Sequence, residues 1–388
     1  MDAEPSEGSP TRRRRALSLI AVAAAVVVAS GIVYLSPRLS SKTSPELRTI
    51  TPGPVTRSGD IITYDVLTAS LGWALVVSTA GADSQYWVFR TTDAAKHWQL
   101  QLKGQFARTL GITLSIQFFD QTHGFVAVGY PIALYRTVDG GLHWVPVALS
   151  DAEAAFVNFS DSRHGWLLVS TPGSPDHPPH LFATADAGDS WQQLPNPPPD
   201  SIRMAFRSPS EGWLWTTSSG PSHLYSSVDA GQSWQSHDPP ELPGRLSGEN
   251  TAVINMSLLP GKGVVTYLAV VQGSGFTLPV YEFTSFDLGG SWRFVPMRPN
   301  QLFNSEGFED SVHWWAIDRE TLYKSSDAGQ TWSKVSTHME NGQFWSYFVH
   351  PLDSKHAWAQ LQIGEGTGLA ITSDGGLTWT RVEVPQPA

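Results

Sequence analysis

The chain has 388 residues, 41% of them hydrophobic and only 15% charged, with 34 Gly, 28 Pro and 16 Trp but no Cys. This composition is typical of a turn-rich β protein, and the lack of Cys excludes disulfides, thiolate metal sites and a cysteine nucleophile. Six of the 25 Lys/Arg and three of the 35 Asp/Glu lie in residues 1–45, so residues 46–388 hold 19 and 32, a net charge of −13. That acidic balance argues against nucleic acid as a partner.

The first predicted element is a membrane-spanning helix at residues 16–35, ALSLIAVAAAVVVASGIVYL. Its twenty residues carry no charge and, at about 1.5 Å per residue, would span roughly 30 Å, the thickness of the hydrocarbon core of a lipid bilayer. The four arginines of TRRRR (11–15) precede it directly, and positive residues beside an anchor stay in the cytoplasm. We therefore expect a single-pass protein of the cell membrane, with residues 1–15 as a cytoplasmic tail and the C-terminal part on the extracytoplasmic side.

Two other targeting signals compete with this anchor. A signal peptide cleaved near Gly31 or a twin-arginine export signal would also place an apolar run after positive residues. The run is long for either signal and lacks a good A-x-A-like cleavage site, so an uncleaved anchor is the preferred interpretation. The Ser/Pro/Thr-rich residues 36–57 indicate a linker, which leaves residues 58–388 as the folded domain.

An eight-residue motif then recurs seven times, as in TSDGGLTW at 372–379 and TVDGGLHW at 137–144. The successive aspartates are 46, 47, 43, 58, 40 and 47 residues apart, and a period near 45 is the length of one four-stranded propeller blade. The motif aspartates are Asp93, Asp139, Asp186, Asp229, Asp287, Asp327 and Asp374, and the motif tryptophans are Trp98, Trp144, Trp191, Trp234, Trp292, Trp332 and Trp379.

Each repeat also shows the alternation of four short strands. In the second repeat, LSIQFFD (114–120), GFVAVG (124–129), ALYRTVD (133–139) and HWVPVAL (143–149) are separated by turns. Such a meander buries its faces only by stacking on neighbours, and seven of them can close into a ring. We predict an all-β, seven-bladed propeller with four antiparallel strands per blade. ELRTI (46–50) is the segment that could add a strand to the last blade.

Every position of the motif has a structural task in the turn between the third and fourth strands. The aspartate can accept hydrogen bonds from backbone N–H groups of its own turn, the glycine supplies a positive φ, and the tryptophan can bury its ring between neighbouring sheets. His97 and His143 stand where other copies have Ser or Thr, and we expect them to substitute in the same hydrogen bond. We therefore assign the motif to architecture and not to catalysis.

These copies are the Asp-box, or BNR-repeat, signature. Together with an upstream Gly-aromatic segment such as HGWLLV (164–169), once per blade, they resemble the photosystem II stability/assembly-factor family and its bacterial relatives over residues 58–384. The resemblance implies a non-catalytic propeller that holds a membrane-protein subunit during assembly. The arginine patch of that family cannot be matched residue by residue here, so the resemblance supplies no site residue.

Asp boxes also occur in sialidases and xyloglucanases, which makes a glycosidase the alternative. The chain contains no Arg-Ile-Pro or Arg-Leu-Pro motif, and no carboxylate pair with the separation that glycoside hydrolysis requires can be recognised. The two histidines of HPPH (177–180) lack an adjacent third metal ligand. We predict no catalytic residue, no metal site and no cofactor.

Recognition is expected on the ring face opposite the short, uniform box turns, because variable loops on a rigid scaffold carry binding sites. The candidate contact residues are Arg108, Arg245, Glu249, Asn250, Phe276 and Trp345. The predicted function is that of a membrane-anchored binding or scaffold propeller whose partner is another membrane or envelope protein. The alternative is a carbohydrate-binding or glycoside-hydrolysing, sialidase-like surface protein whose ligand is a glycan.

Overall fold

The computed structural model describes residues 49–50, 53, 56, 60–79, 83–107, 113–129, 132–149, 154–169, 178–199, 201–216, 223–243, 251–272, 275–296, 306–318, 321–339, 346–363 and 366–387. These residues form strands, turns and irregular connections. None of the described segments is a helix with the length and apolar character needed to cross a bilayer. The predicted anchor at residues 16–35 and the tail before it lie outside the described residues.

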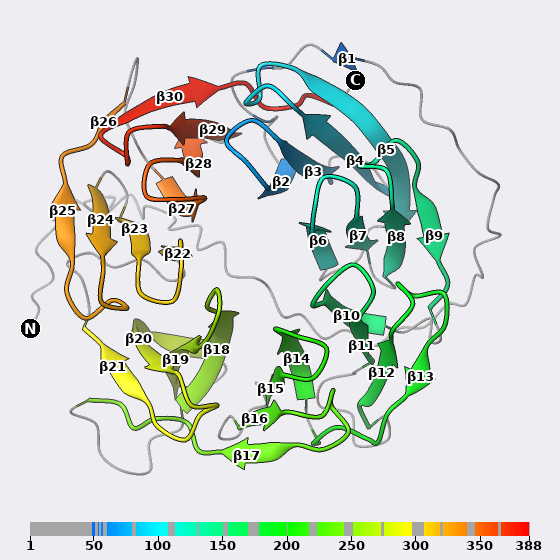
Figure 1. Cartoon of the computed structure of the whole chain (residues 1–388), viewed down its shortest axis with the longest axis vertical. Helices are drawn as coiled ribbons and strands as arrows, with labels where there is room; N and C mark the ends of the chain where they lie inside the picture. The colour runs from blue at the N-terminus through cyan, green and yellow to red at the C-terminus, as the bar shows by residue number, and fades with distance from the viewer. Residues whose placement is uncertain are drawn as a thin grey trace, which may run out of the picture.

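The strands form seven antiparallel sheets arranged around a central axis (Figure 1). Blade 1 holds β2 (Asp60–Val66), β3 (Gly72–Ser78), β4 (Asp83–Thr91) and β5 (Trp98–Ala107); blade 2 holds β6 (Thr113–Phe118), β7 (Gly124–Gly129), β8 (Ala133–Thr137) and β9 (Val145–Val147). Blade 3 holds β10 (Ala154–Phe159), β11 (Gly165–Val169), β12 (His180–Thr184) and β13 (Gln192–Gln193); blade 4 holds β14 (Ser201–Phe206), β15 (Gly212–Thr216), β16 (Leu224–Ser227) and β17 (Gln235–His237).

The remaining blades complete the ring. Blade 5 holds β18 (Thr251–Leu258), β19 (Val264–Gln272), β20 (Gly275–Ser285) and β21 (Arg293–Val295); blade 6 holds β22 (Glu306–Phe308), β23 (Trp314–Asp318), β24 (Thr321–Ser325) and β25 (Ser333–Val335). Blade 7 holds β27 (Ser346–Pro351), β28 (Ala357–Ile363), β29 (Gly366–Thr372) and β30 (Thr378–Val382). The prediction of a seven-bladed propeller with four antiparallel strands per blade is confirmed.

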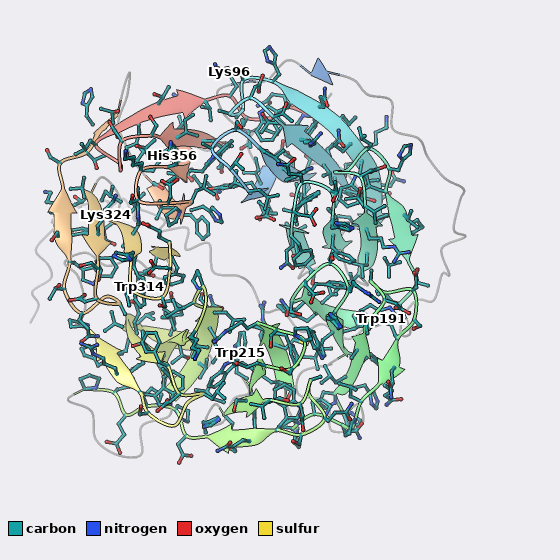
Figure 2. All side chains as sticks on the ribbon, viewed as in Figure 1. Lys96, Trp191, Trp215, Trp314, Lys324 and His356 are labelled. Atoms are coloured by element: carbon teal, nitrogen blue, oxygen red, sulfur yellow. The ribbon has the colours of Figure 1, made fainter. Side chains whose placement is uncertain are left out.

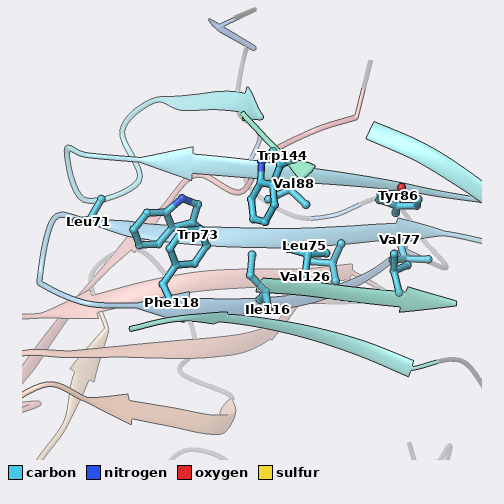
Figure 3. Packing of buried hydrophobic residues seen from close by; sticks show 11 residues of the cluster. Leu71, Trp73, Leu75, Val77, Tyr86, Val88, Ile116, Phe118, Val126 and Trp144 are labelled. Atoms are coloured by element: carbon cyan, nitrogen blue, oxygen red, sulfur yellow. The ribbon is translucent and has the colours of Figure 1, made fainter. Parts of the chain in front are cut away.

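The first strand of each blade lies nearest the axis and the fourth lies at the rim (Figure 1). The second strands, such as GFVAVG in β7 and GWLLV in β11, are buried along their whole length. They are enclosed by the strands beside them and by the two adjacent blades, which explains why they are continuously apolar and do not alternate. The core therefore lies in the seams between blades, as Figure 3 shows for Trp73 and Leu75 of blade 1 packed against Phe118 and Val126 of blade 2.

The ring closes without a swapped strand, since each blade is built from four consecutive strands. The possible pairing of residues 46–50 with the last blade is not formed by the described part of that segment: β1 (Thr49–Ile50) adds a fifth strand to blade 1, pairing with the start of β5. The contacts with blade 7 come slightly later in the chain. Gly53 forms a bridge with Val384, and Thr56 N–H donates to the carbonyl of Thr367 over 2.8 Å.

We call residues 49–56 the N-terminal strap, of which 49–50, 53 and 56 are described. It contacts both blades that meet where the ring closes, because β1 pairs with blade 1 whereas Gly53 and Thr56 bond to blade 7. Trp98 of blade 1 adds to the closure by donating its indole N–H to the carbonyl of Glu383 over 3.0 Å. A second added strand, β26 (His338–Met339), pairs in parallel with β30 on the rim of blade 7.

Candidate functional site

The Asp boxes lie on the same face of the ring as the turns between the first and second strands. In six blades the backbone N–H after the box aspartate donates to a carbonyl of that turn, over 2.8–3.0 Å. The pairs are Ala94–Ser70, Gly140–Thr122, Ala187–Arg163, Ala230–Ser210, Ala328–Val312 and Gly375–Lys355. We call this face the box face; it is built from turns that brace each other within every one of these blades.

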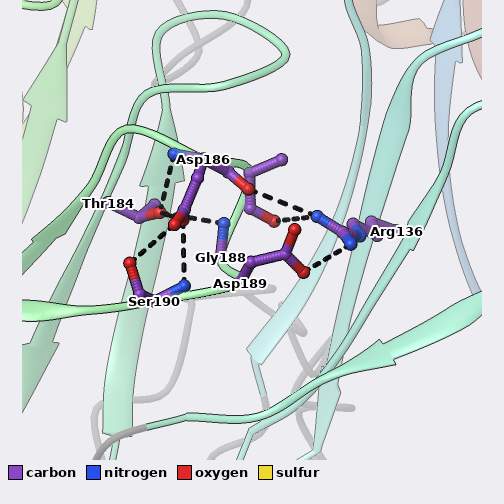
Figure 4. Close-up of polar contacts among 7 residues, drawn as sticks. Arg136, Thr184, Asp186, Gly188, Asp189 and Ser190 are labelled. Atoms are coloured by element: carbon purple, nitrogen blue, oxygen red, sulfur yellow. Dashed lines mark hydrogen bonds and ion pairs between the residues drawn. The ribbon is translucent and has the colours of Figure 1, made fainter.

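The box of blade 3 illustrates how the motif closes its turn (Figure 4). The hydroxyl of Thr184 donates to Asp186 Oδ1 over 2.7 Å and accepts the N–H of Gly188 over 2.9 Å. Ser190 donates its N–H to Oδ1 over 2.9 Å and its hydroxyl to Oδ2 over 2.6 Å. Both carboxylate oxygens are thus used inside the turn, and these donors lower the pKa of Asp186 to about 2, with the Ser190 hydroxyl as the largest cause.

The same network is present in the other boxes. His97 Nδ1 lies 2.6 Å from Asp93 Oδ2, and His143 Nδ1 lies 2.7 Å from Asp139 Oδ2, in the place of the Ser or Thr hydroxyl. Because every donor belongs to the turn itself, these carboxylates have no free oxygen pair directed at a substrate. The further aspartates with these contacts are Asp229, Asp287, Asp327 and Asp374.

The box backbone contains a left-handed residue that the sequence did not reveal. The residue directly after the aspartate has a positive φ even where it is not glycine, as in Ala94 (60°), Ala230 (64°) and Leu288 (58°). Ala95 of blade 1 is also left-handed, with φ of 63°, at a position where the other boxes have glycine. A side chain costs about 1 kcal/mol in this conformation, so the box of blade 1 holds two such residues in succession.

Aromatic rings join neighbouring blades beneath the box face. Trp73 of blade 1 stacks on Phe118 of blade 2 with ring centroids 3.5 Å apart, and Phe118 meets the box tryptophan Trp144 edge-on at 6.0 Å. The indole N–H of Trp73 also donates to the carbonyl of Gly140 in the next box, over 3.2 Å. The equivalent three-ring groups are Phe125–Phe159–Trp191 between blades 2 and 3 and Trp166–Phe206–Trp234 between blades 3 and 4.

A basic side chain from the third strand reinforces the seam between blades 2 and 3 (Figure 4). Arg136 donates to the carbonyls of Asp186 and Ala187 over 3.3 and 3.1 Å and forms an ion pair with Asp189. All three acceptors belong to the box of the following blade. The arginine therefore lies across the seam and fastens one blade to the turn of the next.

Two more third-strand cations occupy the same position in other blades. The guanidinium carbon of Arg90 lies 5.6 Å from the ring centroid of Trp73. Lys324 places its ammonium group 3.4 Å from the ring centroid of Trp315 and donates to the carbonyl of Ser354 in blade 7 over 3.2 Å. Burial lowers the pKa of Lys324 to about 8, and it lowers the pKa of Arg90 as well.

Polar residues near the end of the first strands link the blades close to the axis. Asp65 accepts the N–H of Phe118 in blade 2 over 2.5 Å, and Asn158 accepts the N–H of Phe206 in blade 4 over 2.8 Å. Gln117 donates to the carbonyl of Phe159 over 3.1 Å. Burial raises the pKa of the Asp65 carboxyl to about 6, although the Phe118 N–H opposes this.

The described carboxylates that could serve glycoside hydrolysis have other partners. Asp65 bonds to backbone, Glu309 accepts the indole N–H of Trp315 over 3.4 Å, and Asp310 accepts the N–H groups of its own turn. Among the described residues no cluster of three or more acidic or histidine side chains could hold a metal ion. His180 of the HPPH segment lies in β12, 3.4 Å from Gln193 Nε2.

The predicted contact residues are not brought together by any described contact. Arg108, Arg245, Glu249, Asn250 and Trp345 lie outside the described residues, and Phe276 lies in β20 without a described side chain. In the sequence, Arg108 lies between β5 and β6, and Arg245, Glu249 and Asn250 lie between β17 and β18. Their role as a contact surface stays a prediction.

The described part of the molecule instead contains a hollow of about 290 Å³ on the box face, where blade 7 meets blade 1. Blade 7 contributes Trp358, Ile371 and Ser373 to its wall, and blade 1 contributes Ser70 and Ala94. Sequence reasoning could not have found this hollow, because the two walls come from opposite ends of the domain.

Residues 94–237, from the box of blade 1 to the end of blade 4, match the sequence profile of the family described as "Photosynthesis system II assembly factor YCF48". The chain is an Asp-box propeller similar to the photosystem II stability/assembly factors. A 92-residue segment is 30% identical to the "Photosystem II stability/assembly factor HCF136, chloroplastic" of Oryza sativa subsp. japonica, covering 22% of this chain and 20% of the rice protein. The chain thus spans a fifth or less of the length of the curated relatives it matches.

Solved structures are also similar to this Asp-box propeller. A structure described as "YCF48 bound to D1 peptide" is 21% identical, with a TM-score of 0.48, and the match covers 71% of this chain and 82% of that one. The GH74 enzyme of Niastella koreensis is 12% identical, with a TM-score of 0.53, and the match covers 85% of this chain and 55% of that one. At these identities the likeness to the GH74 enzyme shows the fold alone and carries no activity to this chain.

Proposed function

We propose that this Asp-box propeller is a non-catalytic protein-binding scaffold that assists the assembly of another membrane or envelope protein. The observation that carries the proposal is the match of residues 94–237 to an assembly-factor family, together with a rice relative named as a stability/assembly factor. The chemistry of the described residues is consistent with binding, because the box carboxylates are used within their own turns. A scaffold of this kind needs rigidity and a recognition surface but no reacting group.

The location of the chain follows from the predicted anchor. We propose that residues 16–35 hold the propeller at the extracytoplasmic surface of the cell membrane. Confinement to that surface would raise the effective concentration of the propeller near membrane-protein partners, which strengthens a modest contact without any added interaction. The predicted contact surface is the face opposite the box face, with Arg108, Arg245 and Phe276 among its residues.

The test is a cross-linked capture from native membranes. The full chain would carry a tag at its N-terminus, because Val384, near the C-terminus, is bonded to Gly53 at the ring closure. After cross-linking and detergent solubilisation, the expected result is one membrane or envelope protein recovered in stoichiometric amount. Recovery of no protein, combined with retention of the chain on envelope glycan or activity on chromogenic glycosides, would replace the proposal with the carbohydrate function.

Matched variants locate the contact surface. Substitution of Arg108 and Arg245 by Glu on the loop face is expected to abolish capture. Substitution of Val138 and Val228 by Ser is the control, because these box-face side chains are each 64% exposed and their loss should leave the fold and the capture unchanged. The opposite pattern would move the contact surface to the box face.

A further inference from the structure

The seam between blades 7 and 1 lacks a side chain that three other seams have. Strand register places Arg90 opposite Trp73 in blade 1 and Lys324 opposite Trp315 in blade 6. In blade 7 the same register places Ile371 opposite Trp358. The three positions are equivalent in their strand ladders. Blades 1 and 6 have a cation opposite the tryptophan, whereas blade 7 has the aliphatic Ile371.

The missing cation has a defined task elsewhere in the ring. Arg136 donates to the carbonyls of Asp186 and Ala187 in the box of the next blade. Lys324 likewise donates to a carbonyl of the next blade, that of Ser354. Ile371 cannot make such a bond, and the same position is also uncharged in blades 3, 4 and 5, where it holds Ala183, Ser226 and Thr284. In blade 7 the shorter side chain is accompanied by a hollow.

The hollow lies at that place. Ile371 and Trp358 form its blade 7 wall, and Ala69, Ser70 and Ala94 form its blade 1 wall. Ala94 is the counterpart of Ala187, whose carbonyl accepts from Arg136. The volume of about 290 Å³ opens on the box face beside Ser70 and Ser373, which are both exposed.

One residue that lines the hollow carries a buried donor without a partner. Trp358 is 1% exposed, and its buried indole Nε1 has no hydrogen-bond partner. The equivalent nitrogens of Trp73 and Trp166 donate to carbonyls of the next box, Gly140 and Ala230, over 3.2 and 2.9 Å. A buried donor without an acceptor is destabilising, and a ligand that brings an acceptor would remove that cost.

We propose that this hollow binds a basic side chain, above all arginine, supplied by a partner protein. The guanidinium takes the position of Arg136 and donates to the carbonyls of Asp93 and Ala94. A backbone carbonyl of the same partner residue accepts from the Trp358 indole. The proposal rests on the proposed protein-binding function and names the chemistry that one of its contacts recognises.

The charges around the hollow set the strength of the contact. Asp374 belongs to the box turn of blade 7 beside it, and Asp353 lies in the preceding turn, paired with His356 at 2.9 Å. Lys96 stands at the box position where Asp189 gives Arg136 its carboxylate, and it extends at the outer rim of blade 1 (Figure 2). Carbonyl oxygens and not a carboxylate therefore supply the acceptors in blade 1, and Lys96→Asp is expected to tighten binding severalfold.

The test uses the full chain in detergent and a defined probe. Isothermal titration with Nα-acetyl-L-arginine amide is expected to show one site per chain, whereas the citrulline analogue, which has the same shape without the charge, should bind at least tenfold more weakly. Equal affinity for the two probes would overturn the proposal. The proposal would also be overturned if binding of the arginine probe were unchanged both in Trp358→Phe and in Ile371→Arg.

Two variants exchange the features of the seams. Ile371→Arg restores the chain's own cation, so it should weaken binding of the probe at least tenfold and raise the melting temperature. Arg90→Ile, at the seam between blades 1 and 2, should create a second binding site of the same kind. An Ile371→Arg variant that is folded, binds the probe normally and still captures its partner would refute the basic-residue site while leaving the proposed function intact. If the unsubstituted chain captures no partner, the proposed function is refuted instead.

Discussion

The seams between blades 1 to 4 differ from the later seams in how their side chains pack, although the box turns are alike in all. In the early seams a phenylalanine at the end of the first strand, such as Phe206, lies between two other aromatic rings. Between blades 4 and 5 that phenylalanine is absent, and His237 lies 5.6 Å from Trp213. The backbone hydrogen bonds of the box thus keep one blade geometry, while each seam is filled by a different set of side chains.

The largest expected effect comes from comparing a tryptophan of each kind of seam. Trp166→Ala should lower the free energy of unfolding by about 3–5 kcal/mol, because it opens a cavity and removes a stacked ring. Trp213→Ala should cost about 1 kcal/mol less, because the Trp213 indole nitrogen has no partner whereas that of Trp166 bonds to Ala230. Urea unfolding followed by tryptophan fluorescence measures both; equal losses would show that the hydrogen bond from Trp166 to Ala230 is not stabilising.

The box should behave in the opposite way, with equal effects in both regions. Asp229→Ala in blade 4 and Asp327→Ala in blade 6 should each cost about 1–3 kcal/mol, because backbone and hydroxyl donors lose their acceptor. Asp229→Asn, which keeps one acceptor oxygen, should cost less. Thermal unfolding monitored by circular dichroism compares the three variants, and a blade-dependent cost would contradict a uniform role for the motif.

A smaller effect of opposite sign is expected at Asp65. Its pKa is raised to about 6 by burial, so its contribution to stability is complete below its ordinary value near 4 and is lost as the pH rises to about 6. Asp65→Asn should therefore raise stability at pH 7 by about 1–2 kcal/mol and have little effect at pH 4. Asn158 already occupies the equivalent position in blade 3, where it accepts the equivalent backbone N–H, that of Phe206 in blade 4.

The box aspartates give the reverse dependence on pH. The pKa of Asp287 is lowered to about 2 by its own turn, so its stabilising contribution is present above its ordinary value and is lost as the pH falls from about 4 to 2. In Asp287→Asn the loss of melting temperature between pH 5 and pH 3 should be smaller than in the unsubstituted chain. An identical pH profile for the two chains would exclude the turn as a source of acid sensitivity.

The smallest expected effect concerns the left-handed pair of blade 1. Ala95→Gly should stabilise the protein by less than about 1 kcal/mol, since glycine adopts the φ of 63° without steric cost but has more freedom in the unfolded chain. Ala127→Gly in β7, where the strand backbone is extended, is the control and should be destabilising by about 0.5–1 kcal/mol. Melting temperatures that fall in both variants would show that the strain at Ala95 is negligible.

The sequence predicted the features that each repeat specifies locally. The number of blades, the four strands in each and the position of the box followed from a period near 45 and from turn residues, because these depend on neighbours within one blade. It could not predict that Arg136 reaches Asp189 in the next blade, or that Ile371 leaves a hollow beside Ala94. Such features depend on which side chains face each other across a seam, and the repeat pattern does not state that pairing.

The way in which the ring closes could not be predicted from the sequence for the same reason. The contact of Thr56 with Thr367 joins residues 311 positions apart, beyond the reach of any period in the chain. The sequence left open whether residues 46–50 add to blade 7, because a short strand can add to the rim of either blade beside the closure. In the folded ring, residues 49–50 pair with blade 1.

The N-terminal strap places Gly53 against Val384, with backbone hydrogen bonds of 3.0 and 2.7 Å between them. The beginning and the end of the propeller are therefore neighbours, and no blade borrows a strand from the other end of the chain. A ring closed in this way has no obligatory first blade: a short connection between the two ends and a new opening between blades 3 and 4 would give a circular permutant with the same set of seams. The order of blades along the gene is thus separable from their order around the ring.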